Sequence, residues 1–114
     1  MKGGAQTLSL GDHCYEEWII IHEFMHALGV EHYHNRPDRD EYVDIYWGNI
    51  KPGWKSQYTI ESDSWTYDTP YDLESFMHYG IGTVSQTTID HTKPGMEPKV
   101  YTYLVILRIY HLYY

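Results

Sequence analysis

The sequence has little of several features that would indicate other classes of protein. Its 114 residues include one cysteine, Cys14, so no disulfide can close within the chain. Eight Lys and Arg stand against sixteen Asp and Glu, and the net charge of −8 leaves no basic surface for a nucleic-acid backbone or an anionic membrane. The longest apolar runs, 18–21 and 103–107, are far shorter than the roughly 20 residues of a membrane helix. We therefore expect neither nucleic acid nor membrane as a partner.

The composition is otherwise that of a globular protein. Hydrophobic residues make up 42% and charged residues 21% of the chain, and thirteen residues are tyrosine. The length argues for one domain over residues 1–114. Residues 1–6 carry one charge but no apolar stretch behind it, so we expect no signal peptide in these residues.

One segment has the strongest helix pattern in the chain. Tyr15 to Leu28 contains no Gly or Pro, begins with acidic residues, and is followed by Gly29 as a stop signal. Its apolar residues lie nearly all round, which predicts a helix mostly covered by protein. Residues 5–10 alternate weakly as an edge strand does, residues 61–74 read as an acidic loop, and residues 100–114 fit strand or helix equally.

The predicted helix carries a group of residues typical of a metal site. His22 and His26 lie four residues apart, so both project from one helical face and can share an ion. Glu23 points about 100° away from His22, where it can reach a water on that ion. Zinc needs a third ligand that the same helix cannot supply, so Gly29 must end the helix and let His32 turn back. The sequence thus predicts one zinc ion held by these three histidines.

The histidines of this group also occur in patterns that bind no metal. Two histidines four residues apart are more often ordinary core or surface residues, and it is the addition of Glu23, Gly29 and His32 that favours zinc. The remaining histidines are expected to be surface or packing residues, because three ligands leave the open position that catalysis needs. These are His13, His34, His78, His91 and His111.

The run from His22 to His32 resembles the signature of the metzincin peptidases. Two later segments, 33–43 with its Arg-Pro-Asp-Arg-Asp run and 71–79 with Ser-Phe-Met-His-Tyr, are similar to the astacin family of zinc endopeptidases, with the best match over residues 3–80. The resemblance implies that Met77 lies beneath the zinc. It also implies that Tyr79 is a displaceable fifth ligand that later stabilises the oxyanion, while Glu23 serves as general base.

The resemblance also implies a fold and a location. The expected fold class is α+β, a metzincin-type catalytic domain with a long active-site helix and a loop-rich C-terminal part, secreted and acting on polypeptide substrates. The N-terminal sheet half of the family's domain has no counterpart here, so the domain is expected to be truncated, and Cys14 matches a cysteine whose partner lies in that half. Tyr33 stands where the family has a glutamate that binds the mature amino terminus.

Two alternatives to an active peptidase follow from the expected truncation. The chain could be a non-catalytic zinc-binding fragment, or an incomplete gene model of a longer peptidase. The region 99–114 resembles the family's terminal helix only faintly, so its structure stays open.

Overall fold

The computed structural model describes residues 4, 5, 7–12, 14, 16–64, 66, 68–82 and 85–101. It contains one α-helix, α1 (Glu17–Ala27), and two short strands, β1 (Val43–Ile45) and β2 (Met96–Pro98), among these residues. Four 3₁₀ helices complete the described elements: η1 (Tyr33–Asn35), η2 (Arg39–Glu41), η3 (Trp47–Asn49) and η4 (Pro52–Tyr58). No helix in this part of the chain is long and apolar enough to cross a membrane.

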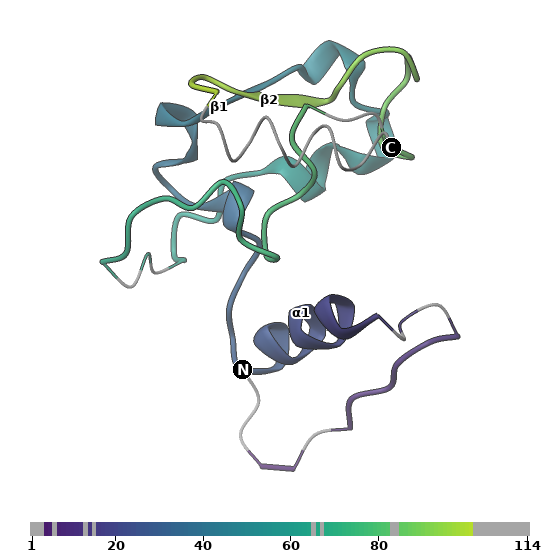
Figure 1. The fold of residues 1–114 in the computed structure, drawn as a ribbon, viewed down its shortest axis with the longest axis vertical. Helices are drawn as coiled ribbons and strands as arrows, with labels where there is room; N and C mark the ends of the chain where they lie inside the picture. The colour runs from purple at the N-terminus through teal and green to yellow at the C-terminus, as the bar shows by residue number, and fades with distance from the viewer. Residues whose placement is uncertain are drawn as a thin grey trace.

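The two strands form a small antiparallel sheet at the end of the molecule opposite α1 (Figure 1). Val43 pairs with Pro98 and Ile45 with Met96, which joins the middle of the chain to the last described segment. Val43 and Met96 are both 1% exposed and pack with Ile81. The core therefore lies at the sheet and in the loops around it. Tyr79, which borders the candidate site, packs against this core.

Two buried arginines tie the loops of this body together. The Arg36 guanidinium forms a two-pronged ion pair with Asp38 and donates hydrogen bonds to the Thr69 carbonyl and the Tyr33 hydroxyl. Arg39 donates to the carbonyls of His34 and Tyr58. Both arginines are about 95% buried or more, and their donors satisfy carbonyls that short loops cannot pair with one another.

Helix α1 ends in a turn that the sequence predicts from Gly29. Gly29 has a φ of 89°, in the left-handed region that glycine adopts without steric cost. Its N–H bonds to the His26 carbonyl at 2.9 Å, and the Val30 N–H bonds to the Met25 carbonyl at 2.9 Å. This pair of bonds is the Schellman arrangement that closes a helix. The chain then leaves the helix axis and leads to His32.

Two predictions about local structure are wrong. The described residues of the expected strand 5–10 belong to no strand, because none of the described strands lies beside them as a partner for the period-two pattern. The helix, which starts at Glu17, has no buried residue, and Trp18, Ile21, Phe24 and Leu28 are 45–65% exposed. The apolar side chains of α1 could pack against other segments, but the described residues cover only part of the helix surface. Tyr15 and the segment 102–114 lie outside the described residues.

Candidate metal centre

Three imidazole rings converge where α1 and the turn after it meet. The His32 Nε2 atom lies 3.2 Å from Nε2 of His22 and 3.1 Å from Nε2 of His26. One ligand atom from each residue lies within 4.8 Å of the other two. The helix supplies two of the rings, and the turn at Gly29 supplies the third, as the sequence predicts.

The outer nitrogen of each helical imidazole is fixed by a backbone carbonyl. His22 Nδ1 lies 2.7 Å from the Phe76 carbonyl oxygen, and His26 Nδ1 lies 2.8 Å from that of Val30. A carbonyl can only accept, so each Nδ1 carries the hydrogen and each Nε2 keeps a lone pair that points into the site. Carbonyl partners of this kind orient the histidine ligands of metals. The Schellman turn thus both ends the helix and supplies the acceptor for His26.

Burial keeps His32 in the neutral form that a metal ligand needs. Desolvation, chiefly, and the repulsion that a protonated His32 would meet from protonated His26, His22 or His78 lower the pKa of His32 to about 4. At neutral pH its ring therefore has a free lone pair as well. His32 Nε2 can donate one hydrogen at most, so at least one of its two short contacts sets lone pair against lone pair.

A turn around Met77 is hydrogen-bonded to the segments that carry the histidines. Met77 is 2% exposed, and its backbone carbonyl accepts a hydrogen bond of 2.7 Å from the N–H of Tyr33. Tyr33 is the residue directly after His32. The preceding carbonyl, that of Phe76, fixes His22. One short turn therefore holds both the first and the last histidine of the group.

Tyr79 borders the site and packs on two histidines. The centroid of its ring lies 4.8 Å from the ring centroid of His32. The same ring stacks on that of His34, with 4.1 Å between the ring centroids. Its hydroxyl lies 3.5 Å from Oε1 of Gln57. Burial and the neighbouring Tyr58 raise the pKa of Tyr79, so its hydroxyl keeps its proton at neutral pH.

His34 and His78 are buried packing residues, as expected. His34 is fully buried, with Nε2 bonded to the Gln57 carbonyl and Nδ1 near the Tyr79 N–H. His78 bonds to the Tyr71 hydroxyl and the Tyr79 carbonyl. Sequence reasoning did not find that these two residues hold Tyr79. His91 is exposed, and His13 and His111 lie outside the described residues.

Two cavities flank the three histidines. One, of about 510 Å³, is lined by Glu23 together with His22, Tyr79 and several aromatic side chains. The Glu23 carboxyl, half-buried there, makes no hydrogen bond or ion pair in the described part of the chain. It is therefore available to a molecule that enters this cavity.

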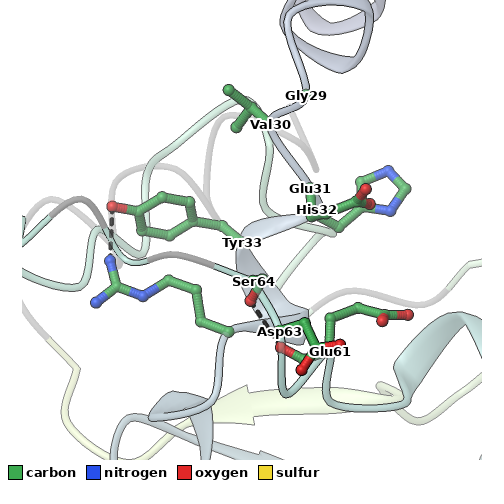
Figure 2. A pocket seen from close by; sticks show the side chains of 9 residues that line it. Gly29, Val30, Glu31, His32, Tyr33, Glu61, Asp63 and Ser64 are labelled. Atoms are coloured by element: carbon green, nitrogen blue, oxygen red, sulfur yellow. Dashed lines mark hydrogen bonds between the residues drawn. The ribbon is translucent and has the colours of Figure 1, made fainter. Parts of the chain in front are cut away.

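The other cavity, of about 320 Å³, is lined by residues 29–33 together with Arg36, Glu61, Asp63 and Ser64 (Figure 2). Figure 2 shows the Tyr33 ring directed away from His32. The Tyr33 hydroxyl accepts a hydrogen bond of 2.8 Å from the Arg36 guanidinium. The same hydroxyl lies 3.0 Å from Thr69 Oγ1. Tyr33, at which the sequence departs from the family that it resembles, is thus fixed by hydrogen bonds to Arg36 and Thr69.

These features define a class of protein, one with a helix-borne centre of three histidines suited to a metal ion. Comparison with known proteins narrows the class. The family model described as Astacin, a family of peptidases, matches residues 1–104. The chain belongs to the astacin family.

Individual relatives agree with this membership. The chain is 44% identical over 98 residues to zinc metalloproteinase nas-13 of Caenorhabditis elegans, a match that covers 84% of this chain and 21% of that protein. It is 44% identical over 77 residues to meprin A subunit alpha of Rattus norvegicus, covering 66% of this chain and 10% of that protein. The chain thus spans about a fifth or less of these relatives.

A solved structure supports the fold. High choriolytic enzyme 1, a hatching enzyme zinc-protease of Oryzias latipes, matches with a TM-score of 0.66 and 34% sequence identity. The match covers 84% of this chain and 52% of that one. The expected astacin-like fold is therefore confirmed over the matched part.

Proposed function

We propose that this chain binds one zinc ion through His22, His26 and His32 and hydrolyses peptide bonds in polypeptides. The observation that carries the proposal is the approach of the Nε2 atoms of His22 and His26 to that of His32, at 3.2 and 3.1 Å. Zinc held tetrahedrally at 2.0–2.1 Å would separate its ligand nitrogens by roughly 3.3–3.4 Å. The spacing therefore fits the ion closely.

The chemistry of the donors also fits a cation. His22 and His26 direct lone pairs inward because their Nδ1 hydrogens bond to carbonyls. With His32 added, the three nitrogens can share at most one hydrogen among them, so at least one contact sets lone pair against lone pair unless a positive charge lies between them. Three histidines leave a fourth position open, which is the pattern of catalytic rather than structural zinc sites.

The residues around the triad supply the rest of the proposed mechanism. A zinc ion held by His22, His26 and His32 would lower the pKa of a bound water from 15.7 to about 7 and would polarise a carbonyl. Glu23, on the wall of the 510 Å³ cavity, takes the proton of the attacking water and later delivers it to the leaving amine. Tyr79, protonated at neutral pH, donates a hydrogen bond to the oxygen of the scissile carbonyl as negative charge develops there.

A second candidate is a zinc-binding fragment without activity. It is favoured by the exposed apolar face of α1 and by the chain's coverage of 52% of the solved hatching enzyme. This candidate retains the three histidines but lacks surfaces that a bound polypeptide needs. An incomplete gene model of a longer, secreted peptidase would have the same properties. This alternative predicts an upstream coding segment with a signal peptide and a cysteine that pairs with Cys14, and transcript sequencing would test for that segment.

The two candidates are distinguished by metal content and turnover. Atomic absorption should find one zinc per chain, and the protein should cleave quench-labelled casein until a chelator is added. One zinc without turnover would support the inactive fragment. A chain that takes up no zinc would contradict both.

A further inference from the structure

The 510 Å³ cavity beside Glu23, which we term the Glu23 cavity, has a distinct lining. Aromatic side chains from three parts of the chain meet there: Trp18 of α1, Trp54 and Tyr58 of η4, and Phe76 of the Met77 turn. Ser85, Gln86 and Thr87 form a short polar wall. A concave site with apolar walls and a few polar groups is the usual form of a site for a small organic group.

Much of this aromatic surface is left for a ligand to cover. Phe76 is 54% and Trp18 55% exposed, although both line a concavity. Tyr58, by contrast, is 3% exposed, with its hydroxyl held by Thr87 at 2.8 Å. The cavity therefore has a fixed floor and apolar rims, and covering those rims is favourable by about 25 cal/mol per Å².

The charged side chain that lines the cavity among the described residues is acidic. Among the described residues that line it there is no Lys or Arg, and the acidic residue is Glu23. Lys51 is close to the polar wall, but it does not line the cavity, and its ammonium donates a hydrogen bond of 2.8 Å to the Gln86 carbonyl. An acidic group in the cavity would meet the like charge of Glu23 and no Lys or Arg among the described lining residues, at a cost that rises as water is excluded.

We propose that the Glu23 cavity receives an aromatic or large aliphatic side chain of the polypeptide substrate, from a residue beside the scissile bond, and disfavours an acidic one. This inference rests on the proposed function, because His22, Glu23 and Tyr79 line the same cavity and place the scissile bond at its edge. The size is sufficient, since a cavity of about 150 Å³ holds benzene. Phe76 and Trp54 are then the residues that determine specificity.

The test uses the zinc-loaded 114-residue chain and a set of quench-labelled peptides. The peptides differ only in the residue on one side or the other of the scissile bond, which is Phe, Leu, Asp or Lys. We expect kcat/KM at one of these two positions to be at least roughly 10-fold higher for Phe than for Asp, the size of effect that a hydrophobic pocket gives. Equal rates, or a preference for Asp, would overturn the inference.

A binding measurement separates this inference from the proposed function. Fluorescence anisotropy of the labelled Phe and Asp peptides reports affinity without turnover. If no peptide is cleaved but the Phe peptide binds at least roughly 10-fold more tightly, the proposed function fails and the assignment of the cavity stands. If peptides are cleaved with no difference in rate or affinity, the assignment fails and the proposed function stands.

Matched variants assign the preference to the cavity wall. Phe76→Ala should reduce the Phe-to-Asp ratio about 10-fold, whereas Phe24→Ala should leave it unchanged, because Phe24 is equally exposed at 54% but does not line the cavity. Gln86→Lys should raise kcat/KM for the Asp peptide by placing a cation on the polar wall. An Asp preference in the wild type that Lys51→Met abolishes would show that Lys51 sets specificity, which would overturn the inference.

Discussion

Glu23 is the residue whose role can be tested most directly. It lies beside His22 in sequence but projects into the Glu23 cavity, where no residue of the described chain engages its carboxyl. Glu23→Ala should lower kcat by about 10²–10⁴ as the general base is lost. Zinc content, measured by atomic absorption, should stay at one per chain. Glu17→Ala, an exposed change in the first turn of α1, is the control, and turnover by Glu23→Ala equal to that control would remove Glu23 from the mechanism.

Tyr79 is tested by removal of its hydroxyl alone. Tyr79→Phe keeps the ring that stacks on His34 but removes the hydrogen-bond donor for the oxyanion. We expect kcat to fall about 10²–10³-fold with little change in KM or zinc content. Tyr46→Phe, at an exposed tyrosine bonded to Glu97, is the matched control. A fall in zinc content that matches the loss of rate would instead indicate a role in binding the metal.

At the scale of single residues, the sequence predicts those whose positions depend on local geometry. His22, Glu23 and His26 lie within one helical turn, and Gly29 fixes where His32 goes, so spacing alone is informative. Trp54, Phe76 and His34 could not be assigned in this way. Their roles depend on contacts between segments far apart in the chain, which no local pattern encodes.

The turn after α1 is the element on which the triad depends. Gly29 has a φ of 89°, and in Gly29→Ala the left-handed conformation costs roughly 1–2 kcal/mol. The Val30 carbonyl that fixes His26 is placed by the same turn, so zinc affinity should fall together with stability. Urea unfolding and competition with a chromogenic chelator measure the two effects.

The control for that turn is Gly48→Ala in η3. Gly48 does not have a positive φ, and a Cβ there would meet no atom within 4 Å. Its substitution should change stability by less than about 1 kcal/mol and leave zinc affinity unchanged. Equal losses in both variants would mean that the conformation of Gly29 is not what holds His32.

At the scale of elements, the sequence pattern predicts helix α1 and where it ends, but it does not predict which segments pack against the helix. The uninterrupted run before Gly29 specifies α1 because helix signals are local. The prediction that α1 is covered failed because an apolar face encodes a capacity to pack, and the partner must come from another segment. The alternation in residues 5–10 failed for the same reason, since a strand exists only when a neighbour pairs with it.

The molecule as a whole has a small apolar core reinforced by buried polar residues. Its buried apolar residues lie around the sheet and the Met77 turn, while Arg36, Arg39, His34 and His78 are also buried. The composition of the chain indicates a core of modest size, but it does not show that charged and polar side chains help to fill it. Buried arginines and histidines make the stability of such a fold depend on their hydrogen bonds and protonation states.

His34 should therefore make the fold sensitive to mild acid. Burial, chiefly, and the nearby charge of His78 lower the pKa of His34 to about 2 from 6.5, so the folded state holds this ring neutral while the unfolded chain protonates it. Its contribution is fully present above pH 6.5 and is lost progressively as the pH falls from 6.5 towards 2. Between about pH 7.5 and 5.0 the loss should be about 2 kcal/mol, with a slope that approaches roughly 1.4 kcal/mol per pH unit once the pH is well below 6.5.

Urea midpoints of the chelated protein at several pH values between about 7.5 and 5.0 measure this slope without a contribution from metal release. In His34→Gln the slope should decrease, because the titrating group is gone while a hydrogen-bond donor for the Gln57 carbonyl remains. In His91→Gln, at an exposed histidine, the slope should equal that of the wild type. If all three proteins lose stability equally, protonation of His34 does not limit the acid stability of the fold, and His32, whose pKa is lowered to about 4 mainly by burial, is the next residue to test.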